Sequence, residues 1–336
     1  IVFIVVFLTN MFKVMNVPHD VVGHFFLSSG QFWSGVAVIL TTITLGQLTA
    51  QVNAATCMLD FVYSRMMLFT TYLSLFVENT GILHSAYLGQ MLFSKIARVP
   101  VTSKEKPTAS QRVFFWGRVL MSSGLLIFAT AITLYAILQG KTTIWAGVPG
   151  PVAAILFFAL TIFVGMLEAL QIALFEVFHM PEEYFANHKV AKENSDLAFR
   201  GKNLQAILIG RQICVTTGMF VIARITTPDF KDGETIFGVS QGVQQFFNTG
   251  LLGAFITTIV ASLAWRIVAA SFPLLFLSNP LAHRTIRLCL LLENSGIGSA
   301  SWLFALYHKT ISGFRVDDVY LWKNDHNHAV PLHDVV

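Results

Sequence analysis

One carboxylate and two amides stand in stretches of the chain that are otherwise apolar. Glu168 and Gln171 lie inside the apolar run 152–178, which is long enough to cross a bilayer. They are three residues apart, so a helix places both side chains on one face. The motif Gly210-Arg211-Gln212 opens the next apolar run.

Polar groups in such a setting have a restricted set of roles. A carboxylate at mid-bilayer costs about 2.5–3.5 kcal/mol on insertion scales, so these residues usually face a bundle interior or a water-filled path. Two interpretations follow. The polar groups line a path for a substrate, or Glu168 is a buried structural acid paired with Arg211.

The composition predicts the class of protein that must position these groups. The 336 residues are 54% hydrophobic and 12% charged, whereas soluble domains carry about 25% charged residues. The net charge of +4 is small and scattered, so no nucleic-acid partner is expected. The three cysteines show no Cys-x-x-Cys spacing and indicate neither a disulfide framework nor a zinc site. We expect an all-α polytopic membrane protein without a cofactor or a resident metal.

The hydrophobic pattern divides the chain into about seven to eight spans. The apolar runs cover residues 1–12, 32–50, 66–93, 113–138, 152–178, 205–225, 249–272 and 283–307. The first run begins at residue 1, so we interpret it as a span cut short and the sequence as a fragment. Basic residues gather in the loops 94–112 and 179–204, which the positive-inside rule would place in the cytoplasm.

An internal repeat runs through the spans. The hexapeptide 77–82, Val-Glu-Asn-Thr-Gly-Ile, recurs as Leu-Glu-Asn-Ser-Gly-Ile 215 positions later, so that Glu78 corresponds to Glu293. Five spans separate the two copies, and an odd number reverses direction across the membrane. Inverted repeats build many secondary transporters, whose sites lie near the midplane at the repeat interface. We expect the remainder of a first repeat in 1–112, a second repeat in 113–312, a polar tail in 313–336, and about a hundred residues preceding residue 1.

Several motifs resemble one family. The matching runs include Gly-Gln-Leu-Thr-Ala-Gln-Val-Asn at 46–53, Phe-Trp-Gly-Arg-Val-Leu-Met at 115–121, Ile-Gly-Arg-Gln at 209–212 and Gln-Gln-Phe-Phe-Asn-Thr-Gly at 244–250. With these runs the chain resembles the diatom silicon transporters. The resemblance implies ten spans in two inverted five-span halves, and sodium-coupled uptake of silicic acid across the plasma membrane. It also implies members with both ends in the cytoplasm, which disagrees with the count of basic residues, so the orientation stays open.

The resemblance also implies which residues meet the cargo. The family pairs the motifs Glu-Gly-x-Gln and Gly-Arg-Gln in each half, and this chain carries one such pair, with Ala169 in place of the glycine. We therefore predict a substrate site made of Glu168, Gln171 and the motif Gly210-Arg211-Gln212. Silicic acid is an uncharged tetrahedral hydroxide, and amides and a carboxylate suit its hydroxyl groups. Arg211 has donors only, so it is expected to neutralise Glu168 or to hold the loop.

Uphill uptake of a neutral solute needs a coupled ion, for which hard oxygen ligands are required. Glu168, Asn248 and Thr249 are the candidates for sodium, since broken helices supply such oxygens in other transporters. Alternatively, Asn248 caps the following helix. Glu78 and Glu293 are either symmetric packing contacts between the repeats or ion-handling groups on the coupling path.

Two other functions fit the sequence less well. A passive channel for small neutral hydroxylated solutes, of the aquaporin kind, is the alternative function, but its paired Asn-Pro-Ala motifs are represented only by Asn279-Pro280. An enzyme is not expected, because no nucleophile, metal-ligand or phosphate-loop pattern occurs. The expected partners are silicic acid, sodium and the lipid bilayer, and a homo-oligomer stays open.

Overall fold

A computed structural model describes most of the chain. The described residues are 39, 42–99, 108–145, 147–178, 180–201, 203–231, 233–296, 298 and 300–314. Among them every named element is a helix and no β-strand forms, which confirms the all-α class. The predicted apolar run 1–12 and most of the predicted tail 313–336 lie outside the described residues.

Four helical stretches in the described part of the chain are long and apolar enough to cross a membrane. They are α8 (Ala109–Leu138), α9 (Gly150–Phe178), α11 (Asn203–Thr226) and the continuous stretch Leu251–Ser271. Each coincides with a predicted apolar run to within four residues. The chain is therefore a multi-pass membrane protein.

The fourth stretch is not a uniform α-helix. It consists of α13 (Leu251–Ile256), the π-helix η3 (Thr257–Leu263) and α14 (Ala264–Ser271). A second π-helix, η1 (Thr42–Leu48), leads into α4 (Thr49–Thr56). Single π-turns inside α-helices are uncommon and often occur at functional sites.

Two predicted runs, 66–93 and 283–307, are each interrupted, which corrects the prediction of single spans there. The first contains α6 (Arg65–Asn79) and α7 (Ala86–Ala97), and the second contains α16 (Pro280–Asn294) and α17 (Ala300–Ser312). Gly81 and Gly296 have φ angles of 74° and 76°. This left-handed conformation is open to glycine and ends the preceding helix. Hydropathy alone does not detect such a break, because a window averages the short polar runs 78–80 and 293–295 with the apolar residues on either side.

The remaining elements are short. They are α5 (Met58–Tyr63), the 3₁₀-helix η2 (Glu182–Phe185), α10 (Lys189–Phe199), α12 (Gln241–Asn248) and α15 (Pro273–Leu277).

Five consecutive elements recur along the chain in the same order. η1, α4, α5, α6 and α7 are followed by η3, α14, α15, α16 and α17, with starting residues 214 to 215 positions apart. Gly81 and Gly296, which end α6 and α16, keep the same offset. The offset found in the sequence therefore also relates secondary structure, including the two π-helices.

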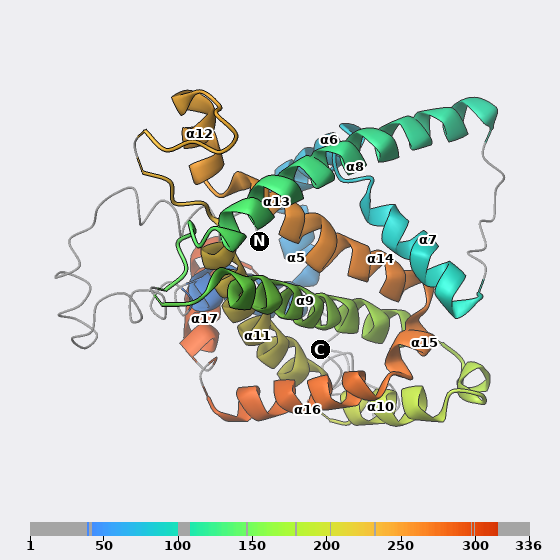
Figure 1. Cartoon of the computed structure of the whole chain (residues 1–336). Helices are drawn as coiled ribbons and strands as arrows, with labels where there is room; N and C mark the ends of the chain where they lie inside the picture. Colours follow the sequence, from blue (N-terminus) through green and yellow to red (C-terminus); the bar gives the residue numbers. More distant parts are fainter. Residues whose placement is uncertain are drawn as a thin grey trace, which may run out of the picture. The chain divides into compact units, whose positions relative to one another are not determined.

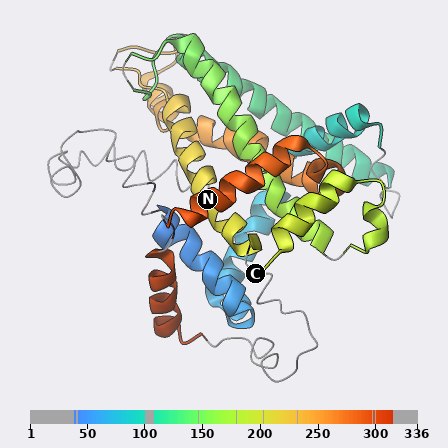
Figure 2. The same ribbon diagram turned by 90° about the horizontal axis from the view of Figure 1, so that it is seen from below.

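The chain forms two compact units, which we describe separately. Of the described residues, the first unit holds Glu78–Ala169 and Val215–Ser271, and the second holds Ile39–Val77, Leu170–Cys214 and 272–314. In the first unit α14 packs against α7, and α13 packs against α8 (Figure 1). In the second unit α17 packs against α4 and η1, and α10 packs against α15 and α16 (Figure 2). Each unit thus takes helices from both sides of residue 112.

Polar loops close one end of the first unit. The Lys141 ammonium lies 3.0 Å from a carboxylate oxygen of Glu234, and the Thr143 amide donates to the Thr227 carbonyl. Lys141 lowers the pKa of the Glu234 carboxyl by donating a hydrogen bond to it. The apolar side chains Val113, Leu120 and Ile127 are exposed along one stripe of α8. Such a stripe suits contact with lipid.

Candidate functional site

The buried acid Glu168 meets an arginine within the first unit. Arg266 on α14 donates to Oε2 of Glu168 from Nε at 3.0 Å and from Nη2 at 2.5 Å. The Glu168 side chain is 6% exposed and the Arg266 side chain 38%. Burial of a carboxylate requires such compensation, because removing one partner of a buried ion pair costs about 3–5 kcal/mol. Sequence reasoning missed Arg266, and the predicted pairing of Glu168 with Arg211 stays a prediction.

Gly165 lets α14 approach the acid. A Cβ atom built on Gly165 would lie 2.3 Å from both Cδ1 and Nε1 of Trp265. The indole therefore occupies the space above the glycine, and the next residue of α14 is Arg266. Gly165 and Glu168 are three positions apart on α9, so one helix face accepts the ring and the guanidinium together.

Replacing Gly165 by alanine is expected to push Trp265 out of its place and to loosen the Glu168–Arg266 pair. Overpacking of this kind costs about 1–3 kcal/mol. We expect a lower thermal midpoint in detergent and weaker uptake of cargo by the reconstituted protein. Gly124→Ala on α8 is the matched control, because a Cβ atom at Gly124 would meet nothing within 4 Å. Equal stability of the two variants would contradict the packing role of Gly165.

In the second unit the predicted Arg211 and Gln212 join a residue of the π-helix η1. Nη2 of Arg211 donates to Oε1 of Gln212 at 2.8 Å, and Nε2 of Gln212 donates to Oε1 of Gln47. All three side chains are buried. The structure thereby brings two of the predicted site residues together and adds Gln47. The signal for Gln47 was available in the sequence, since it is an amide at the end of the apolar run 32–50.

Gly210 holds the neighbouring helix close to this network. A Cβ atom on Gly210 would lie 1.9 Å from the Cys289 carbonyl oxygen of α16 and 2.6 Å from its carbonyl carbon. The backbones of α11 and α16 are therefore in direct contact at this point. Gly210 acts through packing, whereas Arg211 and Gln212, the next two residues, supply polar atoms.

Gln171 is the predicted site residue that follows Glu168 on the α9 helix. It lies one helical turn after Glu168 on α9 and is half-buried. Its amide makes no hydrogen bond with the part of the chain that the structure describes. An amide in this position can both donate to and accept from a hydroxylated ligand.

Comparison with known proteins decides the family. A family model described as silicon transporter matches residues 1–334, which is nearly the whole chain. The chain belongs to the silicon transporter family. The resemblance inferred from the motifs is thereby confirmed, and the protein is a membrane transporter of silicic acid. No curated protein and no solved structure gives a significant match.

Asn248 and Thr249, the two residues proposed for ion coupling at the end of α12, make local hydrogen bonds in this silicon transporter. Asn248 donates to the Phe230 carbonyl at 3.1 Å and accepts from Gln244 at 3.0 Å, while the Thr249 hydroxyl donates to the Phe246 carbonyl at 2.7 Å. Asn248 does not cap α13, because Gly250 precedes that helix in a left-handed conformation. Their role as sodium ligands stays a prediction.

The repeated acids of the transporter differ in their surroundings. The Glu78 side chain is 57% exposed and lies 3.9 Å from Nε2 of His84. Glu293, its counterpart near the end of α16, is half-buried. Neither the packing role nor the ion-handling role of this pair is tested, so both stay predictions.

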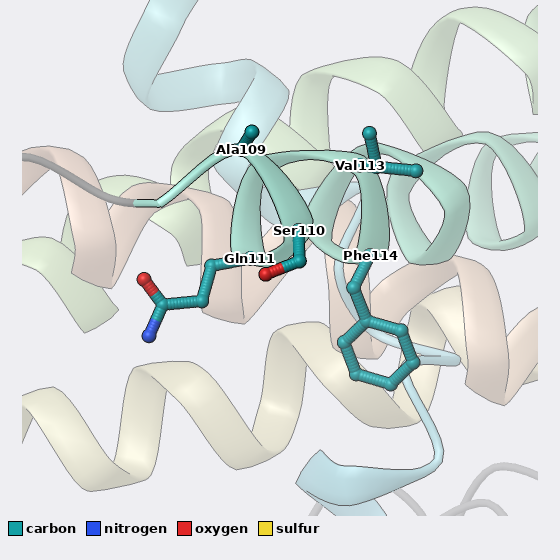
Figure 3. A pocket seen from close by; sticks show the side chains of 5 residues that line it. All are labelled: Ala109, Ser110, Gln111, Val113 and Phe114. Atoms are coloured by element: carbon teal, nitrogen blue, oxygen red, sulfur yellow. The ribbon is translucent and has the colours of Figure 1, made fainter.

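A shallow pocket on the transporter is lined by none of these residues. Figure 3 shows it lined by Ala109, Ser110, Gln111, Val113 and Phe114, all from the first turns of α8. The Gln111 amide is occupied there, because it accepts from the Thr108 backbone while Thr108 caps the helix. We assign no function to this pocket.

Proposed function

We propose that this transporter takes up silicic acid across the plasma membrane by sodium symport, with alternating access between two inverted repeats. The observation that carries the proposal is the buried amide network of Gln212 and Gln47 beside Arg211. Neutral amides suit a cargo that carries no charge, and each amide can exchange its partner for a cargo hydroxyl group.

The chemistry of the cargo supports this choice of residues. Burying a hydroxyl group without a partner costs on the order of 2–7 kcal/mol, so a silicic acid site must supply a donor or an acceptor for each hydroxyl group. Gln171 supplies an amide that makes no hydrogen bond with the described residues, and Gln212 supplies an amide that would exchange its present partners for the cargo. Glu168 adds carboxylate oxygens, one of which is shared with Arg266.

The repeated elements support the proposed architecture. The same series of elements, a π-helix followed by short helices and an interrupted helix, occurs twice, about 215 residues apart. Inverted repeats with discontinuous helices are a common construction of secondary transporters, whose coupling ions are held by half-helix ends near the midplane. An inward sodium gradient would supply the free energy that a neutral solute cannot take from the membrane potential.

The proposal is tested with the purified full chain in sealed liposomes. We expect an inward sodium gradient to drive uptake of radioactive germanic acid, the nearest stereochemical mimic of silicic acid, and unlabelled silicic acid to compete with it. Replacing sodium by N-methyl-D-glucamine, or collapsing the gradient with a sodium ionophore, is expected to abolish accumulation. Equal accumulation without sodium would reject symport, and equilibration without accumulation would favour a channel.

Replacing Glu168 by glutamine is expected to weaken the response to sodium more than the maximal rate of uptake. The substitution keeps the shape of the side chain but removes the negative charge that attracts a hard cation. The measurement is the sodium concentration for half-maximal uptake, which should rise about tenfold for the loss of one charge-assisted contact. A sodium response equal to that of the unmodified chain would remove Glu168 from the coupling path.

A further inference from the structure

In the Glu168–Arg266 pair the guanidinium contacts one of the two carboxylate oxygens. Both donors of the guanidinium, Nε and Nη2, reach the same oxygen, Oε2. An arginine that clamps a carboxylate most firmly places its two donors on the two oxygens. In this pair Arg266 leaves Oε1 to other contacts, and its own side chain is 38% exposed while that of Glu168 is 6% exposed.

The pair lies within two membrane-spanning stretches. Glu168 belongs to α9, and Arg266 belongs to the stretch Leu251–Ser271. A carboxylate there must be neutralised whenever no other cation is bound, because the desolvation of an isolated ion is several kcal/mol. The positive charge of Arg266 performs that neutralisation from within the chain.

We propose that Arg266 is a tethered cation that holds the Glu168 carboxylate while no coupling ion is bound and is displaced when sodium binds there. This inference rests on the proposed sodium symport. Sodium and the guanidinium compete for one carboxylate, since both together would place two positive charges around a single negative charge in a medium of low dielectric constant. Binding of the ion therefore requires the release of Arg266.

Because of the packing next to the pair, release of Arg266 changes the contact between α9 and α14. Trp265 lies against Gly165 without space for a Cβ atom. Because Arg266 is the next residue on α14, release of its guanidinium removes a polar contact between α9 and α14 next to the ring on the glycine. Ion binding is thereby coupled to the packing of these two helices within the first unit.

The tethered charge belongs to one copy of the repeated elements. The residue at the position of Arg266 in the first copy, 215 positions earlier on α4, is the neutral Gln51, and Ala50 stands at the position of Trp265. The amide of glutamine cannot replace a sodium ion. Among these paired positions, competition between a side chain and the ion is therefore specific to α14.

Replacing Arg266 by glutamine tests the inference. The variant removes the competitor, so sodium should reach half-maximal uptake of germanic acid at a concentration about tenfold lower, because charge-assisted hydrogen bonds no longer have to be broken. In detergent, the thermal midpoint of the variant should also respond to sodium at lower concentration than that of the unmodified chain. Arg112→Gln, at an exposed arginine in the first turn of α8, carries the same change of charge and should leave both values unchanged.

Two further variants keep the test decisive if Arg266→Gln does not fold. Arg266→Lys keeps the charge without the two-donor fork and should shift the sodium response in the same direction by a smaller factor. Glu168→Gln combined with Arg266→Gln removes both charges, should insert stably, and should lose the gain in sodium response expected of Arg266→Gln, because the carboxylate for which the two cations compete is absent. A response of Arg266→Gln or Arg266→Lys equal to that of the unmodified chain would overturn the tethered-cation role alone. Uptake by the unmodified chain without any need for sodium would instead reject symport itself.

Discussion

Alanine in place of Gln212 is expected to abolish uptake of silicic acid while leaving insertion into the membrane normal. Gln212 is the central member of a buried network, accepting from Arg211 and donating to Gln47. Its loss removes an amide from the proposed cargo path and both of these hydrogen bonds, at a cost of about 1–3 kcal/mol for each buried group that loses its partner. Uptake of germanic acid into liposomes should fall below about a hundredth of the unmodified rate, since a loss of 3 kcal/mol of binding alone accounts for such a factor.

The control for this variant is Gln205→Ala. Gln205 lies on the same helix, α11, is half-buried, and makes no hydrogen bond with the described residues. It should insert equally and transport at the unmodified rate. If Gln212→Ala transported as well as Gln205→Ala, Gln212 would have no place in the cargo path.

The second large effect is expected from Gly210→Ala, which adds a single methyl group. The added carbon would lie 1.9 Å from the Cys289 carbonyl oxygen, an atom of the helix backbone that no rotamer change can move. α16 must therefore shift away from α11 as a whole, which we expect to cost about 3 kcal/mol, at the upper end of the usual range for overpacking. The thermal midpoint in detergent should fall, and uptake should be lost, because Arg211 and Gln212 follow Gly210 directly.

Gly117→Ala separates this clash from the general effect of removing a glycine. Gly117 lies on the long helix α8, and a Cβ atom there would meet nothing within 4 Å. Alanine favours a helix over glycine by about 0.5–1 kcal/mol, so this variant should be as stable as the unmodified chain or more stable. A Gly210→Ala protein with unmodified stability would show that α16 does not depend on close backbone contact.

The long helices were predictable from sequence for a simple physical reason. In lipid every backbone polar group must be satisfied within its own segment, so a long apolar run has to be helical. The runs 113–138, 152–178 and 205–225 accordingly coincide with α8, α9 and α11. The breaks at Gly81 and Gly296 were not predicted, because a window of hydropathy averages over one residue in a left-handed conformation.

The site was predictable in its residue types but not in its partners. Glu168 and Gln212 are conspicuous because polar atoms are costly in apolar surroundings. Arg266 lies 98 positions from Glu168 and Gln47 lies 165 positions from Gln212. Pairs at such separation depend on how helices pack, which no local pattern encodes. The packing roles of Gly165 and Gly210 were equally unpredictable, since only the structure shows which atoms lie against these glycines.

The interleaving of the two compact units has a consequence for how the protein is made. α7 meets its packing partner α14 in the first unit, and α4 meets its partner α17 in the second, so the first unit cannot close before α14, and the second before α17, has been synthesised. Early helices must wait in the bilayer, and contacts between residues distant in the chain form slowly. If synthesis stopped halfway along the chain, both units would be incomplete, and cellular quality control would encounter two misfolded units in one protein.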